Sequence, residues 1–456
     1  MTLRATNIGR AVAASGLRPR TARYLLDYVL RHGAELERLL PDQNGKAERL
    51  DEFYALVIYA CLCSPEFDLP ASGGTRIPPY MLDRARLALP IRRDLSRHFA
   101  DTPEANAGRV ASTNLAIRWI KGEPSRDLEK EAEALTLGML RSHFRDLAQV
   151  IAGLAALVFA LVKDARADDA EPQLLKLAEF LARLPRLLRR TARRVEEGLP
   201  NEVLWMAEIE SDSPDHRLSR ADMLALYKNG IVSPIQAMDQ NRKPERLKAF
   251  ANAQPSPSAK ENWFVQVVRQ WKKKQRDRLA GRHRKRAARC PEPGLVSDYY
   301  EHREKMFEAT LERVLEAIGI DFDKTDVPPK RGFADYILRI GNLQPIVLEV
   351  KSKTSEDLVG LNACTDVLRA SELMGHAQAR CVTLCHPGYD PSVPSGILNV
   401  ARLCIVEAPH LAEALLRVCE GHLSLEDLHR WLTASGEALP ADLPASPARR
   451  KSATSA

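Results

Sequence analysis

The stretch 333–353, FADYILRIGNLQPIVLEVKSK, constrains the fold more than any other part of this 456-residue chain. Two apolar runs rich in Ile, Leu and Val flank the dipeptide Gly341-Asn342. Gly and Asn at the centre of such a pattern are typical of the tight turn of a β-hairpin. The stretch therefore predicts two antiparallel strands joined by a short turn.

Charged side chains interrupt the apolar pattern of this hairpin at defined positions. Side chains alternate between the two faces of a strand, which puts Asp335 on one face of the first strand and Glu349 with Lys351 on one face of the second. In a hairpin centred on Asn342, Asp335 and Glu349 are directly opposite, with their β-carbons roughly 4.5–5.5 Å apart. Two facing carboxylates repel each other, so the pattern favours a divalent cation bound between them.

The spacing of the acids and the lysine resembles a known nuclease family. Asp335, Glu349 and Lys351 match the Asp-x(n)-Glu-x-Lys signature of the PD-(D/E)XK nucleases, with Ala334 where these usually have Pro. A helical stretch over 358–379 and two short apolar strands, CVTLC and LCIVEA, follow the hairpin. These elements complete the αβββαβ order of that nuclease core, as the resemblance implies.

A second part of the resemblance lies upstream of the hairpin. The sequence KMFEATLERVLEAIGIDF is similar to the first helix of Mrr-type restriction endonuclease domains, whose Phe-Glu pair supplies another acid to the metal. The matching acid here is Glu308. Glu304 and Glu312 lie one turn away on the same helix face and stay open as alternatives.

The resemblance implies a metal-dependent catalytic site. Asp335 and Glu349 would bind one or two Mg²⁺ or Mn²⁺ ions, with the backbone carbonyl of Val350 and the carboxylate of Glu308 as further ligands. Lys351 would orient or polarise the water that attacks the phosphate. The alternative is an exposed edge hairpin whose Asp and Glu-x-Lys pair are solvated surface charges.

Residues 1–240 are predicted to be mainly helical, with breaks at Pro and Gly clusters. Three segments, TNIGRAVAASGLRPRTARYLLDYVL, FYALVIYACLCSPEF and LAIRWIKGEPSRDLEKE, resemble in this order parts of the tail that follows the motor in superfamily 2 helicases of the archaeal DNA-repair type. The resemblance implies a winged-helix-like domain over 1–100, a helical bundle over 101–195 and a degenerate helix-hairpin-helix over 196–240.

In those helicases a long helix of the bundle, called the ratchet, lies along the single strand that leaves the motor. In this chain Arg141, Phe144 and Arg145 would make the matching contacts, by binding phosphate or stacking on a base. Arg189 and Arg190, in a basic helix that follows, are further candidates for phosphate contacts. The alternative is that Phe144 belongs to the core and the charged residues to a solvated face.

The predicted helix-hairpin-helix departs from its family at the positions that grip phosphate. The hairpin Gly is replaced near Ser219, and Met223-Leu224 stand where arginines are expected, although Arg217 and Arg220 remain. A docking or structural role is therefore at least as consistent with the sequence as DNA binding.

The chain has no sequence of the form GxxxxGK[ST] and no predicted strand that ends in an acidic Walker B motif. We therefore expect no ATP hydrolysis by this chain. A helicase-like tail without a motor predicts a separately encoded helicase or ATPase subunit as a partner.

A basic segment connects the two halves. Residues 241–290 are predicted to be a linker followed by the run VVRQWKKKQRDRLAGRHRKRAARC, which has the highest density of Lys and Arg in the chain. DNA is the expected partner of this run. The residues predicted to contact it are Lys272, Lys273, Lys274, Arg284, Lys285 and Arg286. The alternatives are a solvated basic face and an amphipathic helix that packs Trp263 and Trp271 on the nuclease domain.

The predicted nuclease domain covers 291–435, and the tail 436–456, rich in Pro, Ala and Ser, is predicted to be disordered. The expected fold class is multidomain, with a mainly α N-terminal half and an α/β restriction-endonuclease-like C-terminal domain.

The composition is that of a globular protein, and the net charge of +7 is small for this length but unevenly distributed. The longest apolar run, VIAGLAALVFALV at 150–162, is too short to span a bilayer and predicts a buried core helix. The N-terminus has no apolar signal core, and the eight cysteines show no disulfide spacing. The protein is therefore expected in the cytoplasm, with reduced thiols and no membrane contact.

Together these features predict a metal-dependent DNA endonuclease subunit that acts with a separately encoded helicase, in defence against phage or plasmid DNA. The alternatives are a DNA-repair nuclease, an RNA-directed nuclease, and a non-catalytic DNA-binding adaptor of a helicase complex.

Overall fold

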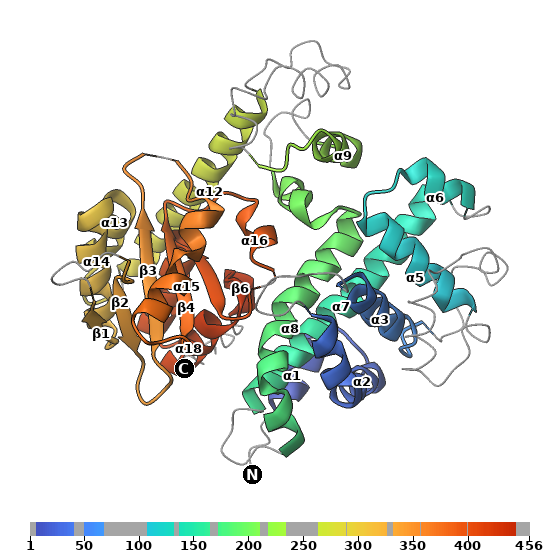
Figure 1. Ribbon diagram of the computed structural model, residues 1–456, viewed down its shortest axis with the longest axis horizontal. Coiled ribbons are helices and arrows are strands. Elements are labelled where there is room, and N and C mark those ends of the chain that lie inside the picture. Colours follow the sequence, from blue (N-terminus) through green and yellow to red (C-terminus); the bar gives the residue numbers. More distant parts are fainter. Residues whose placement is uncertain are drawn as a thin grey trace, which may run out of the picture. The chain divides into compact units, whose positions relative to one another are not determined.

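The structure of the chain is a computed structural model that describes residues 6–40, 50–67, 107–131, 136–164, 172–209, 218–233, 263–288, 290–325, 332–355, 357–398 and 400–443. The chain forms two compact units. The helical unit holds the described residues up to Val232, and the sheet unit holds nearly all of those from Trp263 onward (Figure 1).

In its described part the helical unit contains helices and no strand. The helices are α1 (Asn7–Ser15), α2 (Pro19–Leu39), α3 (Leu50–Leu62), α5 (Ala107–Ile120), α6 (Ser125–Glu131), α7 (Leu137–Asp164), α8 (Pro172–Glu197), the 3-10 helix η2 (Asn201–Glu208) and α9 (Arg220–Lys228). α1 begins after Thr6, whose side chain accepts a hydrogen bond from the Gly9 amide, and ends at Gly16 in the left-handed conformation. α2 begins with a Pro in its first turn, where no amide donor is needed.

A single apolar core runs through the helical unit from Leu17 to Val195. α7 and α8 pack along each other, and α1, α2, α3 and α5 pack around them. α3 is apolar on all sides, and every residue from Phe53 to Leu62 is buried. The boundary expected at residue 100 therefore does not divide two hydrophobic cores, because the described residues on its two sides share one core.

α7 is longer and more apolar than the run 150–162 alone indicates. Its stretch Leu137–Val162 has the length and apolarity to cross a membrane, and among the described residues no other helix does. However, 67% of its most apolar window is buried inside the protein. Such burial is typical of the central helix of a water-soluble bundle, which agrees with the expected core helix.

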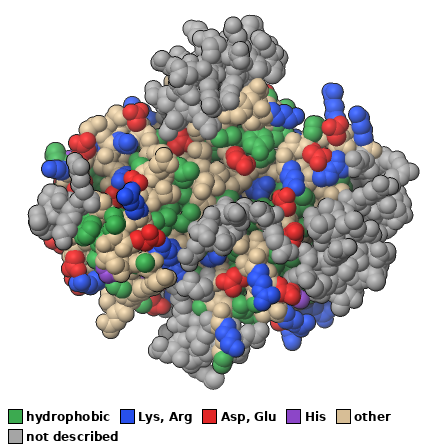
Figure 2. Space-filling model, viewed as in Figure 1, with side chains coloured by type: hydrophobic (Ala, Val, Ile, Leu, Met, Phe, Trp, Pro, Cys, Tyr) green, Lys and Arg blue, Asp and Glu red, His purple; other side chains and the backbone are tan. Residues whose placement is uncertain are grey.

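The surface mixes charges of both signs. The chain has 67 basic and 60 acidic side chains. On the face drawn in Figure 2, Lys and Arg are interspersed with Asp and Glu rather than gathered in one area. On this face a polyanion would therefore meet local groups of exposed cations and not one large basic area.

The sheet unit wraps a six-stranded sheet in helices. Its elements are α12 (Trp263–Ala287), α13 (Gly294–Glu301), α14 (Glu304–Ala317), β1 (Asp321–Lys324), β2 (Tyr336–Arg339), β3 (Ile346–Ser352), α15 (Leu361–Leu373), β4 (Arg380–His386), α16 (Val393–Gly396), β5 (Leu403–Glu407), α17 (Ala408–Cys419), α18 (Leu425–Thr433), β6 (Gly436–Glu437) and the 3-10 helix η4 (Pro440–Asp442).

The strands follow the order β1-β2-β3-β4-β5-β6 across the sheet, so each strand neighbours the next along the chain. β1, β2 and β3 are antiparallel, whereas β3, β4, β5 and β6 are parallel. In the β2–β3 pair, Tyr336 faces Leu348 and Leu338 faces Ile346. This register is the one predicted for a hairpin centred on Asn342, and the mixed sheet confirms an α/β C-terminal half.

One face of the sheet builds the core of the unit. Leu348 and Val350 of β3 join Phe307 of α14 and apolar residues of α17 and α18 in one buried cluster. These residues alternate along β3 with polar ones, so the polar ones must lie on the opposite face.

The opposite face is covered by α15, which packs on β3 and β4 (Figure 1). The Thr383 hydroxyl of β4 donates a hydrogen bond of 2.7 Å to the Cys364 carbonyl of α15. Glu349 and Lys351 share this face with Thr383, because β3 and β4 are parallel and Glu349 is in register with Thr383. The predicted catalytic residues of β3 thus lie on the α15 side of the sheet.

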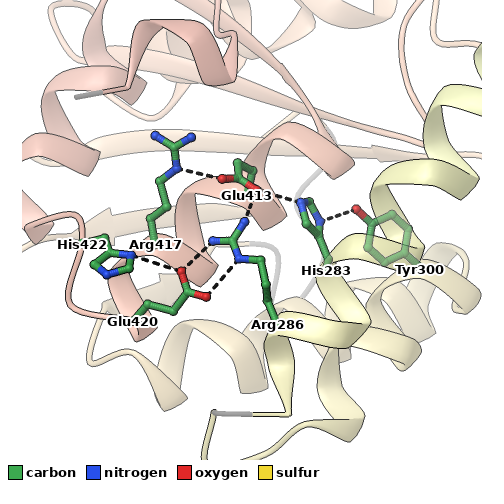
Figure 3. Close-up of polar contacts among 7 residues, drawn as sticks. All are labelled: His283, Arg286, Tyr300, Glu413, Arg417, Glu420 and His422. Atoms are coloured by element: carbon green, nitrogen blue, oxygen red, sulfur yellow. Dashed lines mark hydrogen bonds and ion pairs between the residues drawn. The ribbon is translucent and has the colours of Figure 1, made fainter. Parts of the chain in front are cut away.

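α12 belongs to the sheet unit and is not part of a linker. It packs on α13 and α17, and Trp271 is only 3% exposed. His283 and Arg286 of α12 both contact Glu413 of α17 in a polar network (Figure 3). The boundary expected at residue 290 is therefore wrong for the basic run, which forms a helix that buries Trp271 in the sheet unit, as one of the alternatives for this segment predicts.

The C-terminal boundary also lies further along the chain than expected. β6 pairs with β5, the Trp431 indole donates to the Leu439 carbonyl at 2.9 Å, and Ala438 and Leu443 are buried. The prediction of disorder from residue 436 is wrong for 436–443, because two apolar side chains in a Pro- and Ala-rich stretch complete the core. The remainder of the predicted tail, 444–456, lies outside the described residues.

Candidate functional site

Asp335 and Glu349 meet at the end of the β2–β3 hairpin. Asp335 directly precedes β2, and the register of Tyr336 with Leu348 places it opposite Glu349. The Asp335 Oδ2 atom accepts a hydrogen bond of 2.7 Å from the Val350 amide. In a strand the N–H and C=O of one residue point to the same side, so the Val350 carbonyl points to the side of β3 on which β2 lies.

Glu349 carries the most unusual polar group of this region. Glu349 belongs to β3, an inner strand of the sheet, and the residue is 9% exposed. The Oε1 atom lies 2.6 Å from Lys351 Nζ, whereas the buried Oε2 atom has no hydrogen-bond partner. A buried carboxylate oxygen without a donor is costly, so a cation bound at Oε2 would remove a penalty that the protein alone leaves in place.

Burial and, to a smaller extent, the nearby charge of Asp335 raise the pKa of Glu349 to about 7, although Lys351 acts in the opposite direction. The same ion pair raises the pKa of Lys351, although burial works against this. Lys351 is therefore the charged member of the pair at neutral pH. Glu349 stays poised between its two protonation states, as expected for an acid that a metal ion would deprotonate.

Lys351 has a second acidic partner that the sequence did not reveal. Its Nζ atom lies 3.5 Å from Asp366 of α15, in addition to its contact with Glu349. No local spacing connects Asp366 to the Glu-x-Lys motif, because the contact exists only once α15 crosses the sheet. Together the two carboxylates hold the ammonium group in place.

The three acids of α14 that could supply a further metal ligand differ in their environments. Glu312 accepts a hydrogen bond of 2.8 Å from the Tyr336 hydroxyl and pairs with Lys324 at 2.6 Å, so its carboxylate already has protein partners. Glu304 is exposed at the start of the helix, with a φ of 50°. Glu308 is half-buried, and it raises the pKa of Tyr336 together with burial and Glu312.

Among the described residues, no three His, Cys, Asp or Glu side chains lie close enough together to hold one metal ion. The structure thus brings Asp335 and Glu349 together without adding Glu308 to the same group. Mg²⁺ is commonly held by one or two carboxylates, with water and substrate phosphate completing its shell. The unpartnered oxygen of Glu349, on a residue that lies opposite Asp335, fits an ion bound in this way.

A second polar cluster lies on the opposite face, at the ends of β3 and β4. The His386 ring stacks on Phe307 at 4.1 Å, and its nitrogens contact Arg303 at 3.1 Å and the Ser352 hydroxyl at 3.3 Å. Burial and the charges of Arg303 and Arg276 lower the pKa of His386 to about 3. A neutral His386 therefore ties the start of α14, which carries Glu308, to the strand that carries Lys351.

The residues proposed to contact DNA from α7 have different environments. Phe144 is fully buried and stacks on Trp119, with 5.3 Å between the ring centroids. It is therefore a core residue and unable to stack on a base, which corrects that part of the prediction. Arg141 and Arg145 are exposed and can reach a phosphate.

Arg189 and Arg190 of α8 are used inside the helical unit. Arg190 donates to the side chain and, at 3.1 Å, to the backbone carbonyl of Asn201. Arg189 lies over the Phe159 ring at 5.9 Å, and burial and the charge of Arg186 lower its pKa to about 10. These internal contacts do not support the predicted phosphate binding.

The region predicted as a helix-hairpin-helix packs within the helical unit. Arg220, at the start of α9, donates to the carbonyls of Gly198, Trp119 and Glu123 at 2.7, 3.2 and 2.9 Å. Its guanidinium also lies 3.8 Å from the centroid of the Trp119 ring. Arg220 is thus fully engaged by the protein, which agrees with a structural role, and Arg217 lies outside the described residues.

The remainder of α9 has the same character. Ser219 caps the helix through a reciprocal pair of hydrogen bonds with Asp222, and Met223 and Leu224 are buried. The positions where arginines would grip phosphate therefore pack against protein.

The basic side chains of α12 divide into internal and exposed groups. Lys272 pairs with Glu407 at 2.9 Å, and Arg286 pairs with Glu420 at 2.7 Å, so neither is presented to a ligand. Arg284 is exposed and pairs with Glu301 at 3.2 Å. Lys273, Lys274 and Lys285 are exposed. The predicted polyanion contact therefore reduces to these exposed side chains.

No protein-family model matches the chain, and no curated protein matches it. The geometry of the described residues therefore carries the functional proposal.

Proposed function

We propose that the sheet unit is a divalent-metal-dependent nuclease with a PD-(D/E)XK, restriction-endonuclease-like fold. The observation that carries this proposal is the buried Oε2 atom of Glu349, which has no hydrogen-bond partner and belongs to a residue that the strand register places opposite Asp335. The order α14, β1, β2, β3, α15, β4 supports the fold, because it matches the αβββαβ order of that family.

The side chains have distinct chemical roles in this proposal. The Val350 amide fixes Asp335, and Glu349 gives up its proton when a cation binds, because its pKa lies near 7. A bound Mg²⁺ or Mn²⁺ ion would stabilise charge on the scissile phosphate and acidify a water molecule. Lys351, held by Glu349 and Asp366, supplies a fixed positive charge beside that phosphate.

We further propose that the substrate is DNA and that a separately encoded helicase delivers it, in defence against phage or plasmid DNA. The resemblance of the first half to a helicase tail, together with the missing ATP-binding loop, supports this part. The exposed Arg141 and Arg145 of α7 and the exposed lysines of α12 are the contacts available to its backbone.

A non-catalytic DNA-binding adaptor is the second candidate. The Glu349–Lys351 ion pair favours this function, because Lys351 gives one of the two carboxylate oxygens of Glu349 a partner without any metal. In this case neither Mg²⁺ nor Mn²⁺ would change the thermal midpoint of the protein.

Cleavage assays on purified full-length protein test these functions. Supercoiled plasmid, single-stranded DNA and RNA are incubated with Mg²⁺ or Mn²⁺, using wild type, E349Q, K351A and the control E301Q, which changes an exposed acid of the same unit. We expect metal-dependent cleavage that falls about 100-fold or more in E349Q and K351A and is unchanged in E301Q. Equal cleavage by all four proteins would refute the site, and RNA cleavage without DNA cleavage would reassign the substrate.

A further inference from the structure

Two cysteines of the sheet unit that are far apart in the sequence lie almost within bonding distance. Cys290 follows the end of α12, and Cys419 is the last residue of α17. Their Sγ atoms are 2.6 Å apart. Both residues are partly exposed, so small molecules in solution can reach them.

A second pair of cysteines shows how close this approach is. Cys364 and Cys385 are both buried, and their Sγ atoms are 3.6 Å apart, at an ordinary contact distance for two thiols. A disulfide bond measures about 2.05 Å. The Cys290–Cys419 distance therefore lies nearer to a covalent bond than to the contact of the other pair.

The surroundings hold the two sulfur atoms in this position. Arg286, four residues before Cys290, donates two hydrogen bonds to the carboxylate of Glu420, the residue after Cys419. Figure 3 shows this pair within the network that also joins His283 of α12 to Glu413 of α17. Formation of a bond between the sulfurs would thus need little movement of either helix.

We propose that Cys290 and Cys419 are a redox modification site that forms a reversible disulfide with a low-molecular-weight disulfide as oxidant. One protein thiolate attacks the oxidant RSSR, which forms a mixed disulfide and releases RS⁻. The second protein thiolate then attacks the protein sulfur of the mixed disulfide and releases another RS⁻. The two protein thiols lose two electrons and two protons, and RSSR becomes two RSH.

Burial, together with the contact to Cys419, raises the pKa of Cys290 to about 12, so Cys290 keeps its proton in the reduced protein near neutral pH. In a reducing compartment such a bond would be transient, as is usual for redox-sensing pairs.

Peptide mapping of the full-length protein tests the site directly. The protein is reduced, freed of reductant and incubated with oxidised glutathione, after which free thiols are alkylated and peptides are analysed without reduction. We expect two of the eight thiols to be lost and a cross-linked peptide pair that contains Cys290 and Cys419. An unchanged thiol count, glutathione adducts alone, or a cross-link between other cysteines would overturn the proposal.

Thermal unfolding supplies a second measurement. The bond closes a long loop, so oxidation should raise the midpoint of the sheet unit by roughly 6–12 °C. Both C290S and C419S should lose this shift, whereas the control C63S, which removes a partly exposed thiol of the helical unit, should keep it. A shift that persists in C290S or C419S would contradict the assignment even if the mapping were positive.

Discussion

Glu349 makes metal binding depend on pH, because its proton and a metal ion compete for the same carboxylate. With a pKa of about 7, the group is largely protonated at pH 6 and ionised at pH 8. Apparent Mg²⁺ affinity should therefore rise with pH and level off above about 7. Calorimetric titrations at pH 6 in two buffers with different ionisation enthalpies measure the expected release of a proton.

The same raised pKa makes the stability of the metal-free protein fall as pH rises. The folded pKa exceeds the ordinary value of 4.5, so folding retains a proton that the unfolded chain releases between about 4.5 and about 7. The contribution of Glu349 to stability is then full below 4.5 and falls as pH rises to 7. E349Q should lose both effects and E301Q neither; proton release by E349Q on binding Mg²⁺ would contradict the role of Glu349.

On α7, core and surface positions should separate cleanly in experiments. F144A removes a fully buried ring that stacks on Trp119 and should destabilise the helical unit by about 3–5 kcal/mol, measured by chemical denaturation. The double variant R141A/R145A should leave stability unchanged and weaken binding to single-stranded DNA, measured by fluorescence anisotropy. Weakened binding by F144A at full stability would restore Phe144 as a base-stacking residue.

Single residues differed in how far the sequence could place them. The pairing of Asp335 with Glu349 was predictable, because a period of two and a turn at Gly341-Asn342 fix the register. Phe144 was not, since it stands between polar residues in a helix whose core-facing side is set by α5 and α8. Asp366 gave no signal at all, because its contact with Lys351 depends on tertiary structure.

At the scale of elements, the polar network of Figure 3 fastens α12 to α17. Glu413 accepts from His283, Arg286 and Arg417 at 2.9, 2.5 and 2.7 Å. E413Q removes the charge that these donors share and should cost about 2–3 kcal/mol. Hydrogen exchange should quicken in α12 while β3 and β4 stay protected, and uniform exchange across the sheet unit would contradict this role.

The network should persist in acid. Burial opposes ionisation of Glu413, but the hydrogen bonds from His283 and Arg417 and the charge of Arg286 prevail and lower its pKa to about 2. Its contribution to stability is therefore full above the ordinary value of 4.5 and is lost as pH falls through about 2.

β6 should be required for stability of the sheet. A chain that ends at Ser435 loses β6, Ala438 and Leu443, which exposes the β5 edge and removes the carbonyl that accepts from the Trp431 indole. We expect a lower thermal midpoint and aggregation through the open edge, measured by calorimetry and light scattering. A chain that ends at Leu443 is the control and should behave as wild type.

At the scale of the whole molecule, α12 decides where the sheet unit begins. A fragment of residues 263–443 keeps the buried Trp271 and the contacts with α17, and we expect it to unfold cooperatively. A fragment of residues 291–443 exposes the apolar face under α12 and should bind a hydrophobic dye, with a poorly cooperative thermal transition followed by circular dichroism. Equal cooperativity of the two fragments would show that α12 is dispensable.

The positions of the two units' boundaries illustrate what the sequence lacks. Apolar runs located β2, β3, β4 and β5 correctly, since each of these strands has its own apolar pattern. Lys and Arg density concealed the apolar side of α12, and Pro and Ala concealed β6, because both join the core through contacts with distant segments. When tertiary packing fixes the first and last elements of a domain, the local sequence pattern gives little sign of where the domain begins and ends.

The sequential order of the strands also governs how the sheet unit can assemble during translation. Each strand from β2 to β6 finds its neighbour already synthesised, so the sheet can grow at one edge as the chain emerges. α12 emerges first but rests on α17, which is made near the end of the unit. During translation, α12 therefore lacks its packing partner α17 until α17 has emerged from the ribosome.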